Sequence, residues 1–259
     1  MKRNKVQFLN YSHKKFNNLF DKFFSNRGEM EKDVSRKVSD ILYKIKFKGD
    51  SELLSMIKKY DNASVNKLEQ IKIDFKTLKK SFDELPLKQK ESLRFASKRI
   101  KDFHKKQMPV PFEFEDNLGV KLGMKFNPIE SVGLYVPGGK AIYPSSVLMS
   151  CIPALVSGVK RRILVSPVST VDPPKIVLAA AYLSEVSEFY AMGGAHAIAS
   201  LAYGTNFIPK VDKIVGPGNL FVSEAKRQVF GKVGIDSIAG PSEVLIISDN
   251  KNDPNWIAY

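Results

Sequence analysis

From residue 131 onward, short apolar β-type runs alternate with helical stretches, and this alternation is the strongest constraint on the fold. The β-type runs lie at 132–136, 163–166, 188–191 and 213–215. Helical stretches follow them at about 145–157, 174–184, 194–203 and 219–230. Alternation at this spacing predicts a parallel sheet with right-handed crossovers, and a last strand is predicted at 244–248. The chain is therefore expected to be an α/β protein.

The loops after these strands are rich in glycine. They read Pro137-Gly138-Gly139, Gly193-Gly194-Ala195-His196, Gly216-Pro217-Gly218-Asn219 and Ala239-Gly240-Pro241-Ser242-Glu243. One such loop can be a structural turn and no more. Because parallel strands end at the same edge of a sheet, where ligands bind, four of them together predict an anion site built on backbone N–H groups. The loops match neither the GxGxxG fingerprint nor the GxxxxGK[ST] phosphate loop.

The first hundred residues are predicted to be mainly helical. Apolar positions at three- and four-residue steps indicate a helix from Met30 to near Gly49, a second helix capped by Asp50, and a third from Pro86 to about Met108. Residues 1–28 are polar and form an arm with one or two amphipathic turns. A β-hairpin is predicted over 112–126, turning near 117–119.

The whole net charge of +14 is located in residues 1–110, which include this helical part. Residues 1–110 hold 28 Lys and Arg against 14 Asp and Glu, while residues 111–259 hold 13 against 13. The lysines lie between acidic residues on polar helix faces, with no aromatic platform for stacking bases. A solvated face is favoured over a nucleic-acid surface, although a basic nucleic-acid-binding protein stays an alternative. That alternative predicts affinity for a duplex that falls steeply with salt.

Other features limit the compartment and the chemistry. No run reaches the 18 or so apolar residues of a membrane span, and the N-terminus lacks the apolar core of a signal peptide, so a cytoplasmic protein without membrane contact is expected. Cys151 is the only cysteine and is predicted to be a small core residue rather than a catalytic thiol. The three histidines, His13, His104 and His196, lie far apart and do not form a metal-binding spacing.

Five segments resemble the histidinol dehydrogenase family, in order and at the expected spacing. They are VGLYVPGG at 132–139, YPSSVLM at 143–149, GGAHAIASLAYGT at 193–205, VDKIVGPGNLFVSEAKRQVFG at 211–231 and AGPSEVLIISD at 239–249. The resemblance runs from about Met30 to the last residue. It implies an aldehyde-dehydrogenase-like fold with a Rossmann-like parallel sheet, in which 29–131 begin the first domain, 132–241 form an inserted NAD-binding domain and 242–259 begin the return. It also implies oxidation of L-histidinol to L-histidine through the aldehyde, with two NAD⁺, zinc and a homodimer.

The same resemblance assigns site residues. Tyr135 in GLYVPGG and Asn219 in GPGN would contact NAD, and Ser242 in GPSE would contact the substrate. His196 stands where the family commonly carries a glutamine that touches NAD. An imidazole can donate one hydrogen bond but lacks the combined donor and acceptor geometry of an amide. Each residue also has a structural interpretation: a core aromatic for Tyr135, a structural histidine for His196, a helix N-cap for Asn219 and a turn hydroxyl for Ser242.

The family's zinc ligands and acid/base residues are expected beyond Tyr259. The chain is therefore interpreted as a truncated histidinol dehydrogenase that holds no catalytic or metal-binding residue of its own and is inactive alone. Two other functions stay open beside the nucleic-acid alternative: a non-catalytic nucleotide-binding module, and a different NAD-linked dehydrogenase that acts on simple aldehydes.

Overall fold

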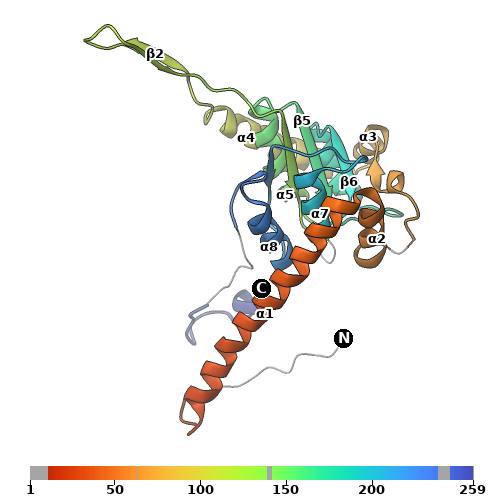
Figure 1. Ribbon diagram of the computed structural model, residues 1–259, viewed down its shortest axis with the longest axis vertical. Helices are drawn as coiled ribbons and strands as arrows, with labels where there is room; N and C mark the ends of the chain where they lie inside the picture. Colours follow the sequence, from red (N-terminus) through yellow and green to blue (C-terminus); the bar gives the residue numbers. More distant parts are fainter. Residues whose placement is uncertain (1–10, 63, 139–141, 239–245, 259) are drawn as a thin grey trace.

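A computed structural model describes residues 11–62, 64–138, 142–238 and 246–258 of the chain, with the side chains of 22–31 left out (Figure 1). Its centre is a six-stranded sheet in the order β1-β6-β5-β4-β7-β8. The strands are β1 (Lys72–Ile73), β4 (Ser131–Tyr135), β5 (Arg161–Ser166), β6 (Glu188–Ala191), β7 (Lys213–Val215) and β8 (Gly234–Ile235). Strands β4 to β8 are parallel and β1 is an antiparallel edge. The predicted α/β class and its four parallel strands are confirmed.

The parallel strands grow in two directions from β4. The chain passes from β4 to β5 and β6 on one side, and then returns to the other side of β4 for β7 and β8. The order therefore reverses between β4 and β7, which makes this pair the topological switch point of the sheet. Loops that leave neighbouring strands in opposite directions open a crevice there, where α/β proteins of this kind bind ligands.

Helices cover both faces of the sheet and enclose two apolar cores. Helices α1 (Phe16–Lys48), α2 (Asp50–Tyr60), α7 (Gly194–Tyr203) and α8 (Leu220–Val229) share one core. Helices α3 (Phe75–Asp83), α4 (Leu87–Lys105), α5 (Pro144–Val156) and α6 (Lys175–Leu183) share the other. All five residues of β4 are buried, as expected for a central parallel strand, with Leu134 in one core and Tyr135 in the other. Cys151 is also buried, in the second core, as predicted.

The first helix is longer than the sequence pattern indicated. Helix α1 begins at Phe16 rather than near Met30, and it ends at Lys48, beside Gly49 with a φ of 57°, as predicted. Gly28 does not break it, because one glycine inside a helix costs only about 1 kcal/mol. The helix crosses α7 and α8, and its N-terminal part extends past the body of the protein (Figure 1). Asp50 is the first residue of α2 rather than its cap, and its carboxylate accepts a hydrogen bond from the backbone N–H of Phe207.

Several short elements were not predicted. They are the 3-10 turn at Leu68–Ile71, β1, α3, β8 and the final helix α9 (Pro254–Ala258). Helix α4 ends at Lys105, slightly before the predicted end near Met108. In the strand expected at 244–248, residues 246–248 are not paired in a sheet, and the two residues before them lie outside the described ranges. The division of the chain at 28, 131 and 241 into domains stays a prediction.

The predicted hairpin consists of β2 (Phe112–Glu115) and β3 (Lys121–Met124) and projects from the body of the protein (Figure 1). Its side chains alternate between two faces. Phe112, Phe114, Leu122 and Met124 share one face through the pairs Phe112–Met124 and Phe114–Leu122, and each is about half exposed. The residues between them include Glu113, Glu115 and Lys121, on the opposite face. The hairpin is therefore amphipathic, and its apolar face is exposed within the described structure.

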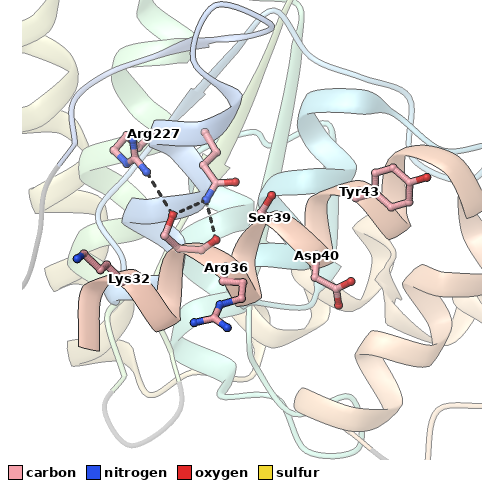
Figure 2. A pocket seen from close by; sticks show the side chains of 8 residues that line it. Lys32, Arg36, Ser39, Asp40, Tyr43 and Arg227 are labelled. Atoms are coloured by element: carbon pink, nitrogen blue, oxygen red, sulfur yellow. Dashed lines mark hydrogen bonds between the residues drawn. The ribbon is translucent and has the colours of Figure 1, made fainter. Parts of the chain in front are cut away.

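Polar side chains join α8 to α1 beside an open groove of about 640 Å³ (Figure 2). The Nε2 of Gln228 donates to the backbone oxygen of Ser35 at 2.9 Å, and Nη2 of Arg227 lies 3.5 Å from the hydroxyl oxygen of Ser35. Glu224 accepts from Arg227 at 2.6 and 2.7 Å and from Gln228 at 2.7 Å. The hydrogen bond from Arg227 outweighs the opposing effect of burial and, with those from Gln228 and Ser35, lowers the pKa of Glu224 to about 2.

We expect Glu224→Gln to lower the free energy of unfolding at pH 7, because the variant loses the ion pair with Arg227. The loss should be only about 1 kcal/mol, because solvent screens much of this partly exposed pair. A carboxyl with a lowered folded-state pKa contributes most above its ordinary pKa of about 4.5, and the contribution is lost as pH falls toward about 2. Urea unfolding measured from pH 7 to pH 3 should therefore show the difference in unfolding free energy between the parent protein and Glu224→Gln becoming smaller. Glu113→Gln on the exposed hairpin is the control and should leave stability unchanged at pH 7. A gap that is constant with pH would contradict the assignment.

Candidate nucleotide-binding cleft

A cleft of about 740 Å³ opens at the carboxyl ends of the strands, at the switch point between β4 and β7. Its walls come from the loops after β4, β5, β6 and β7 and from one side of α1 and α2. Tyr135, His196 and Asn219, the three residues assigned to a cofactor from the sequence, all line it. One ligand of suitable size could therefore touch all three. Ser242, the assigned substrate contact, lies outside the described residues.

The turn after β7 approaches the end of β4 so closely that only glycine fits. A Cβ atom on Gly216 would lie 2.0 Å from the carbonyl oxygen of Tyr135, and the φ of Gly216 is 117°. A Cβ on Gly218 would lie 2.3 Å from the side chain of Val222 in α8. Gly216 therefore allows two backbone segments to approach closely, and Gly218 allows the turn to pack against the side chain of Val222. Phosphate-binding turns use glycine for such close approaches.

An ion pair between buried Lys226 and partly exposed Asp236 holds this turn. Lys226 of α8 is 2% exposed; its ammonium group donates to the Gly216 oxygen at 2.9 Å and also to the Asp236 carboxylate. Asp236 in turn accepts from the Gly216 N–H at 2.8 Å. Burial by itself would raise the pKa of Asp236, but the hydrogen bonds from Lys226, Gly216 and Ser237 outweigh it and hold the pKa below its usual range. Both polar groups of Gly216 are thus satisfied by this pair.

The opposite wall is the glycine turn after β6. The hydroxyl oxygen of Tyr135 accepts a hydrogen bond from the N–H of Gly194 at 3.2 Å, and burial raises the pKa of this phenol. Gly193 packs on Pro167, since a Cβ there would lie 2.6 Å from the proline ring. Tyr135 therefore links the end of β4 to the start of α7, and its hydroxyl already has one structural partner inside the cleft.

His196 is buried at the base of this wall and is held by the N-terminal helices. Its Nε2 lies 2.7 Å from Oδ2 of Asp61, at the end of α2, and the same oxygen accepts from the N–H of Gly193 at 3.2 Å. The ring of Tyr60 lies nearly parallel to the imidazole, with centroids 6.1 Å apart. Asp61 therefore joins α2 to the glycine turn, although nothing in the sequence around it marked it as a site residue.

Asn219 caps α8, as the alternative interpretation predicted. Its Oδ1 accepts from the N–H of Val222 at 3.1 Å, and the residue is exposed at the rim of the cleft. Capping occupies the amide oxygen, while the amide nitrogen carries the donors that a ligand could meet.

The cleft suits an anionic nucleotide. The N-termini of α7 and α8 reach it through Gly194, Ala195 and Asn219, and helix N-termini favour negative charge. Lys37, Lys44 and Lys59 also line it, with Lys44 paired to Asp40 at 2.7 Å. Glycine turns, two helix starts and lysines together fit a dinucleotide such as NAD.

The described residues do not supply a set of ligands that would fit a metal ion. Within the described ranges, no three His, Cys, Asp or Glu side chains form a group that could hold a metal ion. His104 contacts Gln107 at the end of α4, His13 lies before α1, and neither lines the cleft. Burial also raises the pKa of Cys151, in keeping with a structural thiol.

Among the described residues, the helices lack the combination of length and apolar character that a membrane span requires.

The sheet order and the cleft define an α/β protein with a mostly parallel, Rossmann-like sheet and helices on both faces. A model of the histidinol dehydrogenase family matches residues 25–259. The chain belongs to this family, whose members are oxidoreductases of histidine biosynthesis.

Individual relatives agree with this assignment. The histidinol dehydrogenase of Nitrosomonas europaea is 43% identical over 254 residues, which is 98% of this chain and 59% of that protein. The enzyme of Brucella abortus is 48% identical over 94% of this chain and 56% of its own length. The crystal structure of histidinol dehydrogenase from Elizabethkingia anophelis matches 86% of this chain and 51% of its own chain, with a TM-score of 0.75 and 33% identity. This chain spans just over half the length of these relatives.

We expect Gly216→Ala to lower the free energy of unfolding by about 3 kcal/mol or more, since the new Cβ meets backbone atoms that cannot move aside. Gly231→Ala is the matched control. Its φ of 90° is also positive, but a Cβ there meets nothing within 4 Å, so it should cost only about 1 kcal/mol. Denaturant unfolding of both variants measures the difference. Equal losses would mean that backbone conformation, rather than the close approach to Tyr135, fixes the turn.

Proposed function

We propose that the cleft binds NAD. The observation that carries this proposal is the meeting of two glycine turns and two helix N-termini at the switch point of a parallel sheet, lined by lysines. Tyr135, His196 and Asn219 are the proposed contacts. Tyr135 would meet the cofactor with its ring and hydroxyl, and Asn219 with its amide nitrogen.

The complete protein, in this proposal, oxidises L-histidinol to L-histidine through L-histidinaldehyde. NAD, when bound, accepts a hydride at each of the two oxidation steps. Ser242 is the proposed substrate contact. Zinc, a homodimer and a cytoplasmic location belong to the same proposal, as does the absence of a nucleic-acid or membrane partner. Family membership supports the substrate, and the relatives' names state the activity.

We further propose that these 259 residues do not catalyse the reaction alone. The cleft supplies positions for a cofactor, but within the described ranges it lacks a donor set for zinc. Alcohol oxidation also needs a group that takes the hydroxyl proton. The resemblance puts both the metal ligands and that base beyond Tyr259.

Titration calorimetry with NAD tests the cofactor proposal. We expect Tyr135→Phe to weaken NAD binding about fivefold to tenfold, because it removes the hydroxyl that accepts a hydrogen bond from Gly194 and is proposed to contact NAD. Tyr43→Phe on exposed α1 is the control and should bind NAD as the parent chain does. Absence of NAD binding by the parent chain at millimolar concentration would contradict the proposal.

A turnover assay tests the second part. The purified chain, supplied with L-histidinol, NAD and Zn²⁺, should form no NADH above the rate without protein. The control is a complete histidinol dehydrogenase, such as that of Nitrosomonas europaea, in the same buffer. Zinc-dependent NADH formation by the 259-residue chain would overturn the proposed inactivity while leaving the cofactor proposal intact.

A further inference from the structure

The contact between Asp61 and His196 constrains the chemistry that His196 can offer to a ligand. A neutral imidazole carries one N–H donor and one acceptor nitrogen, and its hydrogen bonds decide which is which. A carboxylate oxygen accepts and does not donate. The 2.7 Å contact to Asp61 therefore needs the proton on Nε2.

The surroundings hold the ring in this orientation. His196 is 2% exposed, and the ring of Tyr60 lies nearly parallel to it at an interplanar angle of 22°. Asp61 is fixed in turn, because its Oδ2 also receives the N–H of Gly193. Rotating the imidazole by half a turn would break the bond to Asp61.

The other ring nitrogen, Nδ1, lies on the side of the glycine turn. A Cβ atom built on Gly194 would lie 3.5 Å from both Nδ1 and Cε1 of His196. Gly194 itself lines the cleft and has a φ of 63°. Within the described residues, the side-chain hydrogen bonds of His196 are made by Nε2 alone. A ligand that reaches the imidazole over this turn therefore meets the Nδ1 edge.

We propose that Asp61 is a positioning residue that holds neutral His196 in the Nε2–H form, so that Nδ1 acts as a hydrogen-bond acceptor toward the cofactor. The group recognised is then an uncharged donor of the dinucleotide, which is a ribose hydroxyl, the amino group of adenine or the carboxamide N–H of nicotinamide, and not a phosphate. The identity of the ligand rests on the proposed NAD function, whereas the proton position on His196 does not.

The proton position is measured without any ligand. Long-range ¹⁵N–¹H spectra distinguish the two neutral forms of each histidine, and the chain has only three, so His196→Gln identifies the signal. At a pH where the spectra show the His196 ring itself to be neutral, we expect the Nε2–H form in the parent chain and a mixture of forms in Asp61→Ala. Asp61→Asn keeps an acceptor oxygen and should retain the Nε2–H form. An Nδ1–H form in the parent chain overturns the proposal.

The link to the ligand is measured by NAD affinity in two backgrounds. With His196 present, Asp61→Ala should raise the Kd for NAD about tenfold, and Asp61→Asn about threefold or less. In the His196→Gln background, Asp61→Ala should raise it no more than about twofold, because a glutamine carries its own acceptor and needs no fixed proton. Equal losses in both backgrounds would show that Asp61 acts on the loop and not through His196. Circular dichroism and melting temperatures confirm that each variant is folded.

Binding of ADP-ribose, which lacks nicotinamide, separates the candidate donors. If the effect of Asp61→Ala persists with ADP-ribose, the donor is a ribose hydroxyl or the adenine amino group; if it disappears, the donor is the nicotinamide carboxamide. Failure of the parent chain to bind NAD, together with an Nε2–H form of His196, would reject the NAD function and the acceptor role toward it. The effect of Asp61 on the imidazole proton would still stand.

Discussion

The close approach of the Gly216 turn to the backbone of Tyr135 is the constraint on which the cleft depends. The carbonyl of Tyr135 leaves no room for a side chain at 216, so β4 and β7 end at a fixed separation. Lys226 and Asp236 hold the turn from below, and the Tyr135 hydroxyl extends the contact to Gly194. The walls of the cleft thus form one connected set of contacts, which links the turn after β7 to the start of α7 through Tyr135.

This set of contacts also joins parts of the chain that are far apart in sequence. Asp61 lies at the end of α2, yet it receives hydrogen bonds from Gly193 and His196. Helix α1 contributes to the core of the same face and lines the cleft through Lys37 and Lys44. The N-terminal helices therefore complete the site instead of standing beside it, because the sheet supplies only one side of the crevice.

Much of this arrangement could be predicted from sequence, for physical reasons. Buried parallel strands are continuous apolar runs and glycine turns are directly visible in the sequence, so β4 to β7 were predicted correctly. The family resemblance assigned Tyr135, His196 and Asn219, and all three line the cleft, while their contacts with NAD stay predictions. The two-residue strands β1 and β8 are too short to show a period, and the start of α1 carries no strong stop or start signal. Asp61 gains its role only from partners more than a hundred residues away in the sequence. Lys226 gains its role from its burial, and in a chain with 41 Lys and Arg nothing local marks it as a buried lysine.

The burial of Cys151 has a practical consequence for studying this protein. It is the only sulfhydryl in the chain, it lies in the middle of α5, the helix that follows the first glycine turn, and its side chain has no exposed surface. Alkylating reagents react with an accessible thiolate. Burial therefore protects Cys151 in two ways: it blocks access to the sulfur, and it raises the pKa of the thiol so that less thiolate forms. The rate of labelling at this one atom therefore reports how often the second core opens. Cys151 is therefore a natural probe of local unfolding in the second core, and no engineered label is needed.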